Sequence, residues 1–131
     1  MILLDTCAII WQALQPQKLS LNARRAIQRA QTGGGLYLMD LSFWEIAMLI
    51  KRQRFDPGTD FKNFIRLVLQ AESYHRLGLS PEVADLATRL PDEVNKDPVD
   101  QMIVASALVH KLPLVTADKN LRRARCVETI W

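Results

Sequence analysis

The feature that most constrains this chain is a series of short apolar runs, each separated from the next by segments with a helical pattern. Ile2–Leu4, Leu36–Leu38 and Leu114–Thr116 are too short for helices and indicate buried strands. Further strands are predicted at Arg76–Leu79 and Cys126–Ile130. Short strands that alternate with helices are typical of a parallel sheet covered on both faces and joined by right-handed crossovers. We therefore predict an α/β fold, a three-layer α/β/α sandwich around a central, mostly parallel sheet.

The helices are predicted from their starting signals. Ser20 is a good N-cap, and Ser42 and Glu45 have the spacing of a capping box. Asp97-Pro98 combines a cap with a proline at the first helical position. The predicted helices cover residues 7–14, 20–31, 42–51, 61–69, a segment from 80 onward, and 97–111. In the last of these, the residues predicted to face the core are Met102, Ile103, Ala105, Leu108 and Val109.

Length and composition indicate one ordinary globular domain. The chain has 131 residues, of which 49% are hydrophobic and 24% are charged, and we expect a single domain over residues 1–131. No apolar run approaches the roughly 18 residues that span a bilayer, and no leader-like segment opens the chain. Cys7 and Cys126 are too few for a disulfide framework. A cytoplasmic protein with reduced thiols and no membrane contact is expected.

The basic residues are grouped. The net charge is only +3, but arginines and lysines cluster in three stretches. Such groups are usually solvated helix faces, whereas around a cleft they would bind a phosphate backbone. The candidates for contact with a nucleic-acid backbone are Arg24, Arg25, Lys51, Arg52, Arg122 and Arg123.

Four acidic residues lie where the predicted fold places ligand sites. Asp5 and Asp118 follow predicted strands, while Glu45 and Asp100 lie near predicted helix starts. Ligands of open α/β sheets bind beyond the carboxyl ends of the strands, so all four would face one crevice if the strands are neighbours. Clustered carboxylates repel one another unless a cation compensates. One or two Mg²⁺ or Mn²⁺ ions prefer such oxygen ligands and activate water for attack on a phosphodiester.

Each acid also has an ordinary structural interpretation. Glu45 would complete a capping box, and Asp100 lies in the first turn of a helix, where the dipole favours negative charge. Asp5 and Asp118 would cap a helix or close a turn. A capping role explains Asp5 least well, because a charged residue between two apolar runs needs further polar partners.

Four segments, in order along nearly the whole chain, resemble the PIN-domain family, and within it the VapC-like toxins of bacterial toxin–antitoxin pairs. They are Ile2–Thr6, Ser42–Ala47, Asp97–Ile103 and Leu112–Asp118. The ending Ile130-Trp131 also resembles one VapC subgroup.

The resemblance implies a role for each matching residue. The family's metal-binding acids fall on Asp5, Glu45, Asp100 and Asp118. Three residues are expected to support these ligands: Thr6, Asp97 as the helix cap, and Thr116. The resemblance further implies Mg²⁺- or Mn²⁺-dependent endoribonuclease activity, a homodimer, and inhibition by a small VapB-like antitoxin.

Two departures from the subgroup concern substrate positioning and dimer contacts. Histidines are frequent there before the Asp-Pro pair, where this chain has Glu93–Lys96, and arginine is frequent where it has Gln101. Neither departure removes a proposed ligand.

Other classes stay open at this stage. A haloacid-dehalogenase-like phosphotransferase would need a second aspartate where Cys7 stands, and a receiver domain would need paired acids and a late lysine. A PIN scaffold that only binds RNA or protein is a non-enzymatic alternative. A nuclease acting on DNA would use the same metal chemistry.

Overall fold

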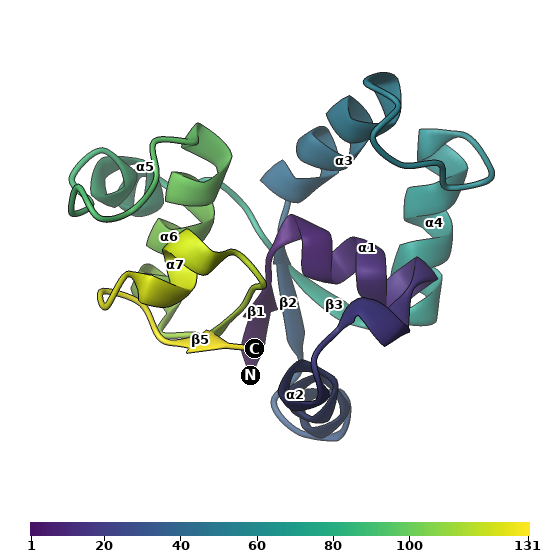
Figure 1. Ribbon diagram of the computed structural model, residues 1–131, viewed down its shortest axis with the longest axis horizontal. Helices are drawn as coiled ribbons and strands as arrows, with labels where there is room; N and C mark the ends of the chain where they lie inside the picture. Colours follow the sequence, from purple (N-terminus) through teal and green to yellow (C-terminus); the bar gives the residue numbers. More distant parts are fainter.

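The centre of the molecule is a five-stranded sheet in which every strand runs parallel to its neighbours, in the order β3-β2-β1-β4-β5 (Figure 1). The computed structural model describes all residues, 1–131. The strands are β1 Ile2–Leu4, β2 Leu36–Met39, β3 Tyr74–Leu77, β4 Leu114–Val115 and β5 Thr129–Ile130. The α/β fold with helices on both faces is confirmed. The third strand begins and ends earlier than predicted, because β2 ends at Met39 and its pairing with β3 ends at Leu77.

Seven α-helices and one short 3-10 segment surround the sheet. Their bounds are α1 Thr6–Leu14, η1 Pro16–Lys18, α2 Leu21–Thr32, α3 Leu41–Lys51, α4 Phe61–Ala71, α5 Pro81–Ala87, α6 Pro98–His110 and α7 Lys119–Arg123. The caps predicted at Ser20 and Asp97 are confirmed, because each side chain accepts a backbone N–H of the first turn. Ser80 caps α5 in the same way. The sequence did not predict η1 or α7. No helix combines the length and apolar character needed to cross a membrane.

The capping box predicted at the start of α3 is wrong. The helix already begins at Leu41, because Asp40 leaves β2 in a helical conformation, with φ −54° and ψ −29°. Ser42 is therefore inside the first turn, and its buried hydroxyl lies 3.0 Å from the hydroxyl of Thr6 on α1. Glu45 lies beyond the first turn, so the helix dipole and the box do not explain its charge.

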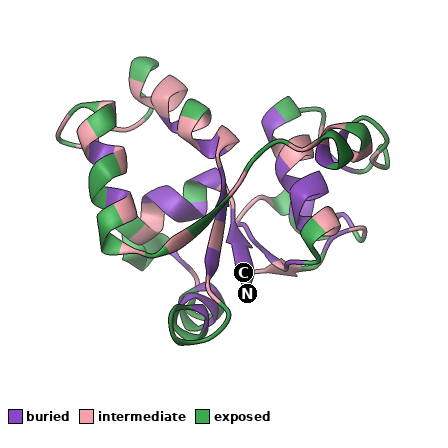
Figure 2. Ribbon diagram, turned by 180° about the vertical axis from the view of Figure 1, so that it is seen from behind, coloured by how far each residue is buried: buried purple, intermediate pink, exposed green.

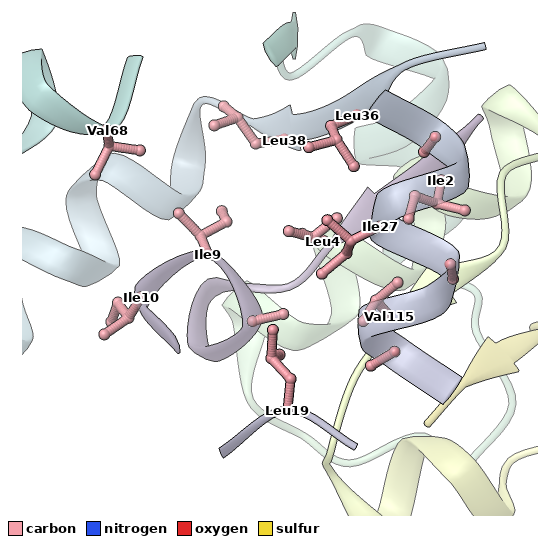
Figure 3. Close-up of a cluster of buried hydrophobic side chains, with 14 of the residues drawn as sticks. Ile2, Leu4, Ile9, Ile10, Leu19, Ile27, Leu36, Leu38, Val68 and Val115 are labelled. Carbon is pink, nitrogen blue, oxygen red and sulfur yellow. The ribbon is translucent and has the colours of Figure 1, made fainter. Parts of the chain in front are cut away.

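Successive residues of β1 point into different cores, as the pleat of a strand requires. Ile2 and Leu4 pack with α1 to α4 on one face, whereas Leu3 packs with α5, α6 and α7 on the other. Figure 2 shows buried residues along the strands and the inner sides of the helices, and Figure 3 shows the first cluster in close-up.

Helix α6 turns the predicted residues towards the core and buries further ones beside them. Ile103 and Ala105 are buried as predicted, and Met102, Leu108 and Val109 are partly buried and pack against the same cluster. The buried residues that were not predicted are Val99, Val104, Ser106 and Ala107. The buried face of α6 is wider than a single apolar stripe, because the helix packs against α5 and also against Leu3 and Leu114 of the sheet.

The order in which the chain adds strands to the sheet changes side at β1. The chain runs from β1 to β2 and β3, then crosses to β4 on the other side of β1. The carboxyl ends of β1 and β4 meet there, where the backbone N–H of Asp5 donates to the carbonyl of Val115 at 3.1 Å. This is the topological switch point at which open α/β sheets bind ligands.

Leu3 provides a test of the two-core arrangement. The Leu3→Ala substitution removes a fully buried side chain from the centre of the sheet, so the free energy of unfolding should fall by about 2–5 kcal/mol in urea denaturation. The matched Leu79→Ala variant removes the same atoms from a side chain that is 52% exposed and should change stability by less than about 0.5 kcal/mol. Equal losses for the two variants would contradict this packing.

Candidate metal centre

Two of the four predicted acids lie at the switch point, and each caps a helix. Asp5 follows β1, and its Oδ1 accepts the backbone N–H of Ala8 at 2.8 Å. Asp118 follows β4, and its Oδ1 accepts the backbone N–H of Leu121 at 3.1 Å. The capping interpretation is therefore correct for both residues, but each cap engages only one carboxylate oxygen.

The other two predicted acids meet a third one. Carboxylate oxygens of Glu45, Asp97 and Asp100 all lie within 4.8 Å of one another. Asp97 caps α6, as predicted, by accepting the backbone N–H of Asp100 at 3.0 Å. Its carboxylate also belongs to this group of three, a position that sequence reasoning had assigned only to a supporting residue.

These groups form one electrostatic unit. Burial raises the pKa of Asp5 from 3.8 to about 6, and the charges of Glu45 and Asp118 add to the rise. Burial likewise raises the pKa of Asp100 to about 6, with further contributions from Asp97, Glu45 and Asp118. The pKa of Glu45 is raised by burial and by Asp97. We call the five carboxylates of Asp5, Glu45, Asp97, Asp100 and Asp118 the acidic centre.

No basic side chain forms an ion pair with the acidic centre. The ion pairs of the chain join Arg76 to Asp40 and Arg89 to Asp85, all outside the centre. Like charges held together in this way demand either protons or a cation. The donors are hard oxygens, which suit a small divalent ion.

Two predicted supporting residues are threonines that lie beside the acids. Thr116 is buried, and its Oγ1 accepts the backbone N–H of Asp118 at 3.1 Å. Hydrogen bonding from Thr116 also lowers the pKa of Asp5, which offsets part of the effect of burial. Hydrogen bonding from Thr6 acts in the same direction on Glu45.

Asn95 connects three parts of the site, and sequence reasoning missed it. Its Nδ2 donates to Oδ2 of Asp100 at 2.9 Å, and its Oδ1 accepts the backbone N–H of Asp97 at 3.0 Å. Its own backbone N–H donates to Oδ1 of Asn120 on α7 at 2.8 Å. Only the tertiary structure brings these groups together. In the sequence, the one indication of a role for Asn95 is its position shortly before the Asp97-Pro98 pair.

The predicted RNA-binding residues do not all gather at one place. Arg52 lines a hollow of about 380 Å³ together with Glu45 and Asp97, and Arg54, which was not among the candidates, lines it too. Arg122 and Arg123 line a separate hollow beside β5, and Arg25 lines a third. Arg24 and Lys51 are exposed and line none of these hollows.

The fold and the site together define a class: α/β proteins with a cation-demanding acidic centre at the carboxyl edge of a parallel sheet. The sequence model of the PIN domain matches residues 2–125. The chain therefore belongs to the PIN-domain family, as its motifs predicted. This membership leaves the haloacid-dehalogenase-like and receiver alternatives without support.

Known proteins resemble the chain over nearly its whole length. Ribonuclease VapC22 of Mycobacterium tuberculosis is 33% identical over 132 residues, covering 99% of this chain and 98% of that protein. A structure of VapBC2 from Rickettsia felis bound to a promoter DNA fragment has a TM-score of 0.74 at 12% identity, covering 98% and 97% of the two chains. A toxin–antitoxin complex from Klebsiella pneumoniae has a TM-score of 0.65 at 19% identity, covering 97% and 95%.

The raised pKa of Asp5 predicts how stability depends on pH without metal. The folded-state pKa of about 6 exceeds the unfolded value of 3.8, so the folded form binds more protons between these values and stability falls as pH rises through this window. At neutral pH the penalty is up to about 3 kcal/mol, since each pKa unit is worth about 1.4 kcal/mol. Asp5→Asn keeps a capping oxygen and removes the charge. In EDTA at neutral pH, this variant should be as stable as the unsubstituted protein or more stable in urea denaturation.

The matched control is Asp60→Asn, which alters the exposed cap of α4, where Asp60 Oδ1 accepts a backbone N–H at 2.7 Å. Because this cap lies outside the acidic centre, Asp60→Asn should not reproduce the stabilisation expected of Asp5→Asn. A drop in stability at neutral pH for Asp5→Asn alone would show that its charge is compensated within the protein.

Proposed function

We propose that this chain is an endoribonuclease that depends on Mg²⁺ or Mn²⁺ and forms the toxin component of a type II toxin–antitoxin pair. The observation that carries the proposal is the convergence of the Glu45, Asp97 and Asp100 oxygens within 4.8 Å without a basic partner. The identity of 33% with Ribonuclease VapC22 over nearly the whole chain supports ribonuclease activity as the chemistry.

The residues of the acidic centre fit one or two divalent ions. Glu45, Asp97 and Asp100 could share a cation, because their oxygens already lie within reach of a common point. Asp5 and Asp118 would complete the ligand set from the ends of β1 and β4, each with the oxygen that does not accept the N–H of its cap. Thr6 and Thr116 would orient these ligands, as hydrogen-bonding neighbours of metal ligands commonly do.

The protein's own groups would bind and position the RNA. When bound, the divalent ions supply activation of water and stabilisation of charge on the phosphodiester. Arg52 and Arg54 line the hollow that also contains Glu45 and Asp97. Their guanidinium groups are suited to bidentate contacts with phosphate oxygens, which would hold the strand against the acidic centre.

The same proposal includes the biological setting of the chain. A small VapB-like antitoxin and a second copy of the chain are the proposed protein partners. Support for the antitoxin comes from the solved toxin–antitoxin complex with the same fold, while the homodimer rests on the resemblance to VapC-like toxins. The cytoplasm is the proposed location, because both cysteines are free.

The central prediction concerns RNA cleavage. Purified protein, free of antitoxin, should cleave members of a panel of tRNA and rRNA with Mg²⁺ or Mn²⁺, and EDTA should abolish this activity. Asp5→Asn and Asp100→Asn should reduce cleavage below detection while the folded state persists, since each removes a proposed anionic ligand. Asp60→Asn, which alters a cap outside the acidic centre, should cleave like the unsubstituted protein.

Two results would contradict the proposal in different ways. RNA binding without cleavage at any metal concentration would indicate instead a PIN scaffold that only binds RNA. Cleavage of single-stranded DNA in preference to RNA would retain the acidic centre but change the substrate.

Asn95 should act as a positioning residue for the metal ligands. Asn95→Ala removes the hydrogen bond to Asp100, so Mn²⁺ affinity measured by calorimetry should fall about 10–100-fold, as for other residues that orient ligands. Asn63→Ala removes an amide on α4 that bonds Thr59 at 2.9 Å and should leave Mn²⁺ affinity unchanged. Unaltered affinity in Asn95→Ala would limit Asn95 to a role in loop structure.

A further inference from the structure

Two hollows lie side by side along the outer edge of the sheet. One, of about 530 Å³, is lined by residues of α7 and β5 and by Trp131. The other, of about 450 Å³, is lined by residues of α2 and β5 and again by Trp131. Thr129 and Trp131 line both hollows, so they form a continuous surface from α7 across β5 to α2. We call this surface the α7–α2 lane.

The lane is strongly and unevenly charged. Its basic lining residues are Lys119, Arg122, Arg123, Arg25 and Arg29. Glu128 is the single acidic side chain among the lining residues. All five cations are exposed, and none of them forms an ion pair. Charges of one sign that are gathered around a hollow attract a ligand of opposite charge.

The lane begins at the acidic centre. Asp118, a member of the centre, caps α7, and Lys119, the first residue of that helix, already lines the lane. Ile130 pairs with Val115, and Val115 pairs with Leu4. Trp131 and Asp5, the next residues after Ile130 and Leu4, therefore both lie at the carboxyl ends of the strands. In Figure 1, α7, β5 with the end of the chain, and α2 follow one another along one side of the molecule.

We propose that the α7–α2 lane binds the phosphate backbone of a single-stranded RNA segment that extends beyond the point of cleavage. This inference rests on the proposed function and adds a contact surface outside the hollow of Arg52 and Arg54. Proteins that bind single-stranded nucleic acids commonly combine basic side chains, which contact the phosphates, with an aromatic ring on which a base stacks. The half-buried indole of Trp131 lies between the two basic groups and supplies such a ring.

The test measures RNA binding without cleavage. The Arg25→Ala/Arg122→Ala variant removes one cation from each side of the lane, and both positions are exposed and unpaired, so the fold should persist. The probe is a fluorescent, unstructured RNA of about 20 nucleotides, a length that covers more than one typical single-strand site. Its Kd is measured by anisotropy in EDTA over a range of salt concentrations. The control, Lys62→Ala/Arg66→Ala, removes two exposed cations from α4.

The lane variant should bind the RNA roughly tenfold more weakly at moderate salt, and its plot of log affinity against log salt should be less steep by about 1.4, or about 0.7 for each lost phosphate contact. The control variant should match the unsubstituted protein. An unchanged Kd and slope in the lane variant, while the unsubstituted protein still cleaves RNA with Mg²⁺, would overturn the lane and leave the proposed function intact. Failure of the unsubstituted protein to cleave any RNA would overturn the proposed function itself. Weakened binding of a DNA duplex of equal length, with unchanged RNA binding, would overturn the assignment to single-stranded RNA.

Discussion

The burial of several carboxylates close to one another at the switch point of the sheet is the constraint that most limits what this site can do. Burial and mutual repulsion raise the pKa of Asp5 and Asp100 to about 6, and no arginine or lysine forms an ion pair with them. A fold that gathers like charges in this way loses stability near neutral pH unless a cation offsets them. The acidic centre therefore makes the strongest case for a metal-dependent function.

Capping and metal binding are compatible roles for the same aspartates. Asp5, Asp97 and Asp118 each accept a first-turn N–H with a single oxygen. The cap holds each carboxylate at the start of a helix that follows either a strand or the loop before α6, and it uses one of the two oxygens. The local hydrogen bond thus orients the carboxylate, and a capping role does not argue against the proposed role in metal binding.

Positive charge is arranged around the acidic centre without neutralising it. Arg52 and Arg54 reach the hollow of Glu45 and Asp97, and the α7–α2 lane begins at the helix that Asp118 caps. This arrangement suits a polyanion that approaches over basic surfaces and meets the acids through bound cations. Asn95 connects the loop before α6 to α7, because it hydrogen-bonds both Asp100 and Asn120.

Most strands and helices, and the resemblance to the family, could be read from the sequence, although η1, α7 and the start of α3 could not. Apolar runs such as Ile2–Leu4 and caps such as Ser20 act through neighbours in the chain, which makes them legible without a structure. The tertiary structure alone decided which groups meet. It placed Asp97 with Glu45 and Asp100, began α3 before Ser42, and brought Asn95 against Asp100 and α7. Burial, charge repulsion and contacts between distant segments depend on the packing of helices against the sheet, and no local pattern encodes those distances.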